Sequence, residues 1–265
     1  MLMFRRERLL SAGMAVLSVA LMLGVVPGGV KSAKAMGAPD KDDQVEAKVH
    51  KTLDNKKFQN VSASIHGPEV VLNGSVDNYA AKEEADKRVH HVKGVKGVEN
   101  DIQVAGPKVE DMELRDKLAK ALSYDRVGYG TTAFNSLSIG VHDGVVTLAG
   151  TVYGPPDKDS ALSLVANTPG VKDIVDNIEV APVSPMDDRL RLELARAIYG
   201  TPQLQKYSLD PAKPIRIIVV NGNVVLSGVV DNKMDHDVAG IRANSVPGVF
   251  KVVNDLQVAS DRASK

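Results

Sequence analysis

VVLNGSV, at residues 70–76, sets the fold of this chain, because the same pattern occurs twice more. The other copies are VTLAGTV at 146–152 and VVLSGVV at 224–230. In every copy the alternate residues, counted from the first, are apolar or glycine, while those between them are mixed. This period of two predicts a strand with one face against a core. The glycine lies on the core-facing side of the pattern, and we expect a helix to cross the sheet there.

A second glycine follows the strand glycine after 20 residues in each copy. The pairs are Gly74 and Gly94, Gly150 and Gly170, and Gly228 and Gly248. Each second glycine precedes a further predicted strand, at 95–104, 171–180 and 249–258. Chance does not preserve both spacing and residue class three times, so the chain contains an internal triplication. We expect all six glycines to be structural, because backbone freedom rather than side-chain chemistry explains glycine at such positions.

Hydrophobic periodicity predicts the same five elements in each copy, in the order helix, strand, strand, helix, strand. The first two strands form a hairpin, and Asp143-Gly144 and Asn221-Gly222 are strong hairpin-turn signals. We place repeat 1 at 42–105, repeat 2 at 110–181 and repeat 3 at 187–259. Units of about 60–75 residues bury only a modest core, so we expect the repeats to pack against one another.

The N-terminal residues are typical of a secretory signal peptide at 1–35. Three arginines precede an apolar run at 9–26, and Ala33-Lys34-Ala35 forms a cleavage box. We expect cleavage after Ala35 and export of the rest of the chain. The alternative is an uncleaved membrane anchor, since a predominantly apolar run of 18 residues is close to the minimum for spanning a bilayer.

Composition excludes several classes of site and partner. The chain has no cysteine, which excludes disulfides and cysteine-ligated metals. After cleavage, 28 Lys and Arg would face 32 Asp and Glu, a net charge of −4. A mildly acidic protein has no general attraction to nucleic acid, so we expect no nucleic-acid partner.

The repeats differ between their first helix and first strand. From the first residue of the helix's apolar stripe (Val45, Leu114 or Leu190) to the strand glycine the distance is 29 residues in repeat 1, 36 in repeat 2 and 38 in repeat 3. The longer connections hold five of the nine aromatic residues of the exported chain. Tyrosine suits a membrane boundary, and nearby basic residues are attracted to anionic lipid. The candidate lipid contacts are Tyr124, Arg126, Tyr129, Phe134, Arg189, Arg196, Tyr199, Lys206 and Tyr207. The alternative is that these tyrosines only fill gaps between packed units.

The three copies resemble the BON domain, a family named for bacterial osmotically induced and nodulation proteins. The resemblance rests on the order of elements, the strand glycine and the Gly-Val pair before the last strand, and it covers nearly all of residues 42–259. It implies an α+β fold of three tandem αββαβ units, each a three-stranded mixed sheet with two helices on one face. It also implies a periplasmic or cell-envelope module that binds phospholipid or another hydrophobic envelope component and has no catalytic residues.

No pattern in the chain indicates catalysis, a cofactor or a metal site. The six histidines fall on separate predicted elements or, at His90-His91, point to different sides of one helix. The aspartates Asp231, Asp235 and Asp237 lack the glycine and the terminal glutamate of a calcium loop. Helix capping is the better account of Asp231, and either Asp231 or Asn232 is expected to cap the helix that follows.

The sequence therefore predicts a non-enzymatic, periplasmic or cell-envelope protein that associates with a phospholipid surface, in envelope maintenance or osmotic stress. The alternative is a protein-interaction adaptor or holdase-like scaffold with an envelope protein as its partner. Polar residues on the outer strand faces, such as Asn73 and Thr147, are compatible with both. The sequence does not indicate an oligomeric state.

Overall fold

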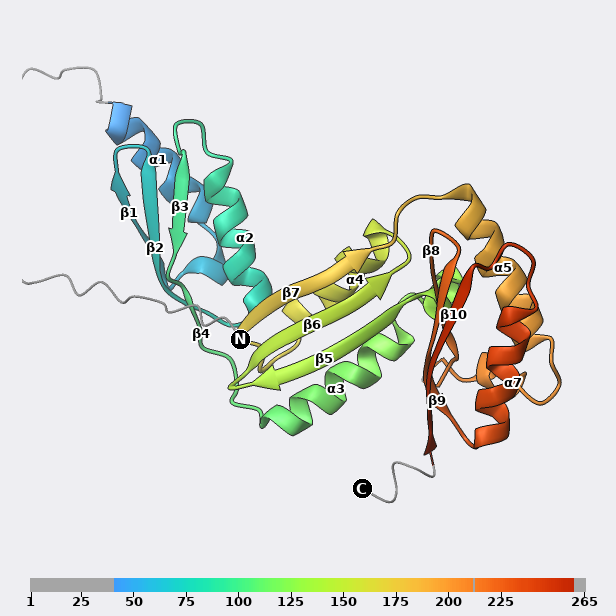
Figure 1. Cartoon of the computed structure of the whole chain (residues 1–265). Coiled ribbons are helices and arrows are strands. Elements are labelled where there is room, and N and C mark those ends of the chain that lie inside the picture. The colour runs from blue at the N-terminus through green and yellow to red at the C-terminus, as the bar shows by residue number, and fades with distance from the viewer. Residues whose placement is uncertain (1–40, 212, 260–265) are drawn as a thin grey trace, which may run out of the picture. The chain divides into compact units, whose positions relative to one another are not determined.

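The computed structural model describes residues 41–211 and 213–259, and these fold into three successive αββαβ units (Figure 1). The expected signal peptide at 1–35 lies outside the described residues. Within the described ranges, no helix has the length and apolar character needed to cross a bilayer.

Repeat 1 has two helices and a sheet in which the central strand is β2. Its elements are α1 (Lys41–Leu53), the 3₁₀ helix η1 (Lys56–Phe58), β1 (Val61–His66), β2 (Glu69–Val76), α2 (Tyr79–His90), β3 (Gly97–Asn100) and β4 (Gln103–Val104). Strand β1 pairs with β2 in antiparallel fashion, while β3 and β4 both pair with β2 in parallel. Strands β3 and β4 are therefore two segments of one edge strand, interrupted at residues 101–102.

Repeats 2 and 3 have the same topology with an unbroken last strand. The elements of repeat 2 are α3 (Asp111–Tyr124), η2 (Val127–Tyr129), η3 (Thr132–Phe134), β5 (Ser136–His142), β6 (Val145–Val152), α4 (Pro155–Ala166) and β7 (Asp173–Val180). Those of repeat 3 are α5 (Pro185–Tyr199), α6 (Lys206–Leu209), β8 (Arg216–Val220), β9 (Asn223–Val230), α7 (Lys233–Asn244) and β10 (Lys251–Val258). In each repeat the second strand is central, with an antiparallel neighbour on one side and a parallel neighbour on the other.

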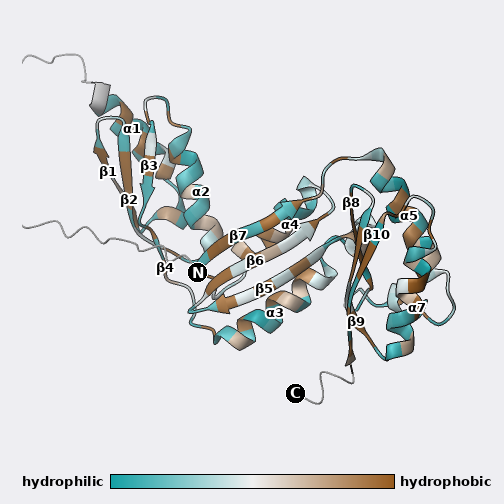
Figure 2. Ribbon diagram, viewed as in Figure 1, coloured by the Kyte–Doolittle hydropathy of each residue, from teal (hydrophilic) through white to brown (hydrophobic). Residues whose placement is uncertain are grey.

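Each repeat has its own core between one face of the sheet and the apolar stripes of its two helices. In repeat 3, Leu194 of α5, Leu226 of β9 and Ala239 of α7 are fully buried in one cluster. Equivalent clusters form in repeats 1 and 2. The colouring of Figure 2 shows hydrophobic and hydrophilic residues alternating along the helices, as amphipathic packing requires. The predicted α+β fold of three tandem units is confirmed.

The strand glycines lie beside a neighbouring strand and not beneath a helix. Gly150 has a φ of +122°, and a Cβ atom built on it would lie 2.1 Å from the carbonyl oxygen of Ser136, where β5 begins. At Gly74 the corresponding distance, to the oxygen of Asn60, is 2.0 Å. The prediction that a helix crosses the sheet here was therefore wrong. The close approach is between two strand backbones, and it needs both the positive φ and the missing side chain.

The hairpin turns of repeats 2 and 3 confirm the predicted turn signals. Asp143 and Asn221 have φ values of 52° and 50°, and a glycine with positive φ follows each. Both turns are also bound by the first helix of their repeat. The carboxylate of Asp187 accepts hydrogen bonds from the N–H groups of Asn221 and Gly222, at 2.8 and 2.9 Å. Asp111 binds the turn of repeat 2 in the same way.

The last strand of each repeat begins three residues after the second glycine, which is later than predicted. It begins at Gly97 in repeat 1, Asp173 in repeat 2 and Lys251 in repeat 3. A polar residue on this strand joins it to the second helix. Asn100 donates to the carbonyl of Lys82, and Asn254 donates to the carbonyl of His236. In repeat 2 the equivalent residue is Asp176, which forms an ion pair with Lys158 at 2.7 Å.

Candidate functional site

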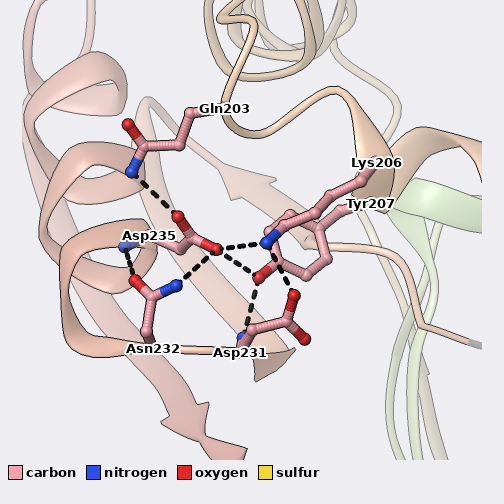
Figure 3. Close-up of polar contacts among 6 residues, drawn as sticks. All are labelled: Gln203, Lys206, Tyr207, Asp231, Asn232 and Asp235. Atoms are coloured by element: carbon pink, nitrogen blue, oxygen red, sulfur yellow. Dashed lines mark hydrogen bonds and ion pairs between the residues drawn. The ribbon is translucent and has the colours of Figure 1, made fainter.

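The connection between α5 and β8, here called loop 3 (residues 200–215), is held to the start of α7 by one buried carboxylate (Figure 3). Asp235 is 2% exposed. It accepts hydrogen bonds from Nε2 of Gln203 at 2.8 Å and from the hydroxyl of Tyr207 at 2.6 Å. The Nζ atom of Lys206 lies 2.8 Å from the same carboxylate. Three side chains of loop 3 thus converge on one acceptor.

Two neighbours complete this cluster. The backbone N–H of Asp231 donates to the hydroxyl of Tyr207 at 2.7 Å, and the carboxylate of Asp231 pairs with Lys206 at 2.6 Å. The cap of α7 is Asn232, whose side chain accepts from the N–H of Asp235. Of the two caps that the sequence offers, Asp231 and Asn232, the structure uses Asn232, because the carboxylate of Asp231 is turned toward loop 3 instead.

Electrostatics favour the charged forms of this cluster. Burial by itself raises the pKa of the Asp235 carboxyl, but the hydrogen bonds from Lys206, Tyr207 and Gln203 outweigh it and hold the pKa below its ordinary value. Hydrogen bonds to Asp231 and Asp235 raise the pKa of the Lys206 ammonium. Around neutral pH the cluster is therefore an ionised and hydrogen-bonded contact.

Loop 2, the connection between α3 and β5 (residues 125–135), is fastened at the equivalent place. Asp157 of α4 lies seven residues after its strand glycine, as Asp235 does, and is 4% exposed. Its Oδ1 atom accepts hydrogen bonds from Arg126 at 3.0 Å, Thr131 at 2.6 Å and Asn135 at 3.0 Å. Two loops that share no sequence pattern therefore use the same anchor.

Repeat 1 lacks this anchor. Its equivalent residue is Ala81, and loop 1 (residues 54–60) is short. The apolar side chain of Phe58, which is 1% exposed, closes this end of the core.

The aromatic candidates divide into buried and exposed groups. Tyr207 is 4% exposed, and the hydroxyl of the partly buried Tyr199 donates to the carbonyl of Ile215. Burial raises the pKa of Tyr199. Phe134 packs against the core cluster of repeat 3. Only Tyr124 and Tyr129, which are 51% and 70% exposed, are mainly on the surface among the five aromatic candidates.

The basic candidates divide in the same way. Arg126 pairs with Asp157 and its guanidinium lies 4.1 Å from the ring centre of Tyr129, while Lys206 pairs with Asp231 and Asp235. Arg189 and Arg196 are exposed on α5.

Sequence reasoning missed two apolar neighbours of these arginines. Met186 and Leu192 are 69% and 53% exposed and share the face of α5 that carries Arg189 and Arg196. The half-buried Glu193 lies on the same face. Helical spacing within 185–199 was the signal that could have identified this set, here called the α5 face (Met186, Arg189, Leu192, Glu193 and Arg196).

The part of the chain that the structure describes contains no cluster of three or more histidine, aspartate or glutamate side chains placed to bind a metal ion. The polar contacts of loops 2 and 3 fasten loops to helices. They leave the α5 face and the exposed tyrosines of repeat 2 as the candidate surface for binding.

Comparison with known proteins identifies similar chains. The model of the family described as the BON domain matches three times, at residues 41–106, 110–182 and 201–260. "Osmotically-inducible protein Y" of Escherichia coli (strain K12) is 23% identical over 189 residues, which cover 71% of this chain and 92% of that protein. Two solved structures of CdsD, described as a structural protein of the type III secretion system of Chlamydia trachomatis, are 15% identical, each covering 83% of this chain. This chain covers 96% and 99% of theirs, with TM-scores of 0.23 and 0.22.

Proposed function

The chain belongs to the BON domain family, and we propose that it is a non-enzymatic protein of the periplasm or cell envelope that associates reversibly with anionic phospholipid surfaces, in envelope maintenance or osmotic stress. The name of the Escherichia coli relative supports a link to osmotic conditions. The signal-peptide pattern at 1–35 supports export.

The α5 face carries this proposal. Met186 and Leu192 expose apolar groups on the same side of the helix as Arg189 and Arg196, which are also exposed. A helix with apolar and basic groups on one solvent-facing side can lie against the headgroup region of a membrane. Each arginine near an anionic leaflet contributes about 1 kcal/mol, which suits a weak and salt-sensitive association. Glu193 opposes this attraction and keeps the association reversible.

Loop 2 supplies a second, smaller contact. Tyr129 projects from η2 with the guanidinium of Arg126 against its ring. Tyrosine places an apolar ring and a polar hydroxyl at a membrane boundary. Because Asp157 already neutralises Arg126, we assign the apolar part of this contact to Tyr129 and the electrostatic part to α5.

Vesicle sedimentation tests the proposal. The mature chain should bind vesicles that contain phosphatidylglycerol, and binding should weaken with added salt. The double variant Arg189→Glu/Arg196→Glu should lose at least roughly tenfold in affinity. Lys48→Glu/Lys51→Glu on α1 is the matched control, because it makes the same change of charge at exposed positions of repeat 1. Equal losses in both double variants, or equal binding to neutral vesicles, would refute the α5 assignment.

A protein partner is the second candidate function, and the edge of repeat 3 favours it. Among the described residues, β10 pairs only with β9, so its other edge can accept an added strand. Phe250, directly before β10, is 80% exposed. If the chain is a holdase-like scaffold, Phe250→Ser should reduce its ability to suppress aggregation of an unfolded client. Met112→Ser, at a position that is 70% exposed on α3, is the control.

A further inference from the structure

A cavity of about 100 Å³ lies beneath loop 2. Its apolar wall includes Leu122 of α3, Leu137 and Ile139 of β5, and Val152 of β6. Its polar side includes Thr132, Asn135 and Asp157. Arg216 also lines the cavity and is fixed by hydrogen bonds from its guanidinium to the carbonyls of Thr132 and Asn135.

The other repeats fill the corresponding space with an aromatic ring from their own connection. In repeat 1 the ring is Phe58, and in repeat 3 it is Tyr207, both buried in the core cluster. In repeat 2, Tyr124 and Tyr129 are exposed, and the core cluster includes no side chain from loop 2. Consequently Leu122 is only partly buried, whereas its equivalents Leu53 and Ile198 are buried. The cavity is thus a specific difference of repeat 2 within a shared fold.

One residue that lines this cavity has a side-chain hydroxyl without a partner. Among the described residues, the hydroxyl of Thr132 is buried without a hydrogen bond. The neighbouring polar groups do have partners: Asn135 donates to Asp157 and accepts from the N–H of Tyr153, and Asp125 accepts from Ser160. An unpaired buried hydroxyl is costly, so a molecule that supplies one hydrogen bond would relieve that cost.

From these features we propose that the cavity of repeat 2 binds a small aliphatic alcohol, with its carbon chain against Leu122, Leu137 and Ile139 and its hydroxyl at Thr132. A cavity of about 150 Å³ lined by apolar side chains can hold benzene, so about 100 Å³ suits a molecule of roughly four non-hydrogen atoms. An ionic ligand does not suit the cavity. Its wall is partly apolar, and the two charged residues that line it, Asp157 and Arg216, already bond to protein groups. This binding does not depend on association with lipid.

Methyl NMR of the whole mature chain tests the proposal, with 2-propanol as the probe. Saturable shifts are expected at the methyl groups of Leu122, Leu137 and Ile139, with millimolar affinity for so small a ligand. The methyl groups of Ile198 and Ile215, in the filled core of repeat 3, serve as the internal control and should not shift.

Two variants separate the apolar and polar parts of the site. Ala119→Leu enlarges an exposed helix residue that lines the cavity, and should weaken 2-propanol binding at least tenfold. Ala47→Leu makes the same change on α1 of repeat 1 and should have no effect. Thr132→Val keeps the volume but removes the hydroxyl, and should weaken binding roughly fivefold.

Three results would overturn the proposal. The first is the absence of saturable shifts at the cavity methyl groups, which would mean that water alone fills the space. The second is an equal shift in repeat 3, which would indicate a general solvent effect. The third is unchanged binding by Ala119→Leu in a protein whose methyl spectrum is otherwise that of the wild type.

Discussion

Repeat 1 and repeat 3 close the equivalent ends of their separate cores with different chemistry. Repeat 1 uses a short connection, the buried ring of Phe58 and a small residue, Ala81, at the start of its second helix. Repeat 3 has a longer connection, and its buried ring, Tyr207, carries a hydroxyl that bonds to Asp235. The buried carboxylate thus occurs where the connection brings donors to meet it, and alanine occurs where the connection contributes the apolar ring of Phe58.

Repeat 2 combines parts of both arrangements. It has the buried carboxylate, Asp157, and a longer connection with three donors, but no aromatic ring of that connection packs in its core. Fastening a loop and filling the core beneath it are therefore separate tasks in this fold. Repeat 3 achieves both through Tyr207, whereas repeat 2 achieves only the first and retains a cavity.

The largest expected effect tests what the repeats share. Gly150→Ala would place a Cβ 2.1 Å from a backbone oxygen at a φ of +122°, so we expect a loss of roughly 3–5 kcal/mol from steric overlap and backbone strain. Gly228→Ala should cost less, because the corresponding distance is 2.7 Å. Urea denaturation measures both. An equal and small loss at the two glycines would contradict the close strand approach.

The next effect separates repeats 1 and 3. Asp235→Ala leaves the Tyr207 hydroxyl and the Gln203 amide without their acceptor, and should cost about 2–4 kcal/mol. Ala81→Asp in repeat 1 should also be destabilising, because Phe58 offers a carboxylate no hydrogen bond. Urea denaturation again gives the values. If Ala81→Asp were neutral, the choice of alanine or aspartate at this position would not depend on the side chains of the facing connection.

A pH series sharpens the same contrast. The folded-state pKa of Asp235 is lowered, so its contribution is complete above the ordinary carboxyl value of about 4 and is lost as pH falls through the folded pKa. The pKa of Lys206 is raised, so its contribution is complete below about pH 10 and is lost as pH rises through the folded pKa. Asp235→Asn should reduce the acid dependence of the urea midpoint. An identical acid dependence in the variant would assign it to other groups.

The smallest effect compares repeats 2 and 3 at their hairpins. Asp187 is 2% exposed, and Asp187→Ala should cost about 1–2 kcal/mol because two turn N–H groups lose their acceptor. Asp111 accepts the equivalent bonds, from Asp143 and Gly144, but is more exposed, so Asp111→Ala should cost less than about 1 kcal/mol. Thermal unfolding of the two variants checks this order, and equal losses would contradict the expected effect of burial.

The repeated strand pattern and the helical stripes made the fold predictable from sequence. They depend on periods of two and of about 3.6 residues, which survive substitution of one apolar residue by another. The hairpin turns were predictable because Asp143-Gly144 and Asn221-Gly222 readily adopt a positive φ. The reason for the strand glycine was not predictable, because it depends on the path of the neighbouring strand.

The sites were less predictable because they depend on which side chains meet across long connections. An aspartate in the first turn of a helix, such as Asp157, is normally solvated, and nothing local indicates that Thr131 and Asn135 reach it. Tyr207 and Tyr129 occupy similar positions in sequence, yet one is buried and the other exposed. Only the helical spacing of Met186, Arg189 and Leu192 along α5 could have been recognised from the sequence, and it was missed.

Hydrogen–deuterium exchange followed by mass spectrometry tests most directly whether each buried aspartate fastens its own connection. Asp235→Ala should raise amide exchange in residues 200–211 and leave loop 2 unchanged, while Asp157→Ala should do the opposite. Protection of β9 and β6 should persist in both variants, since their ladders do not involve these carboxylates. Unchanged exchange in the loop facing the substituted aspartate, or equal exposure of both loops in either variant, would contradict the account.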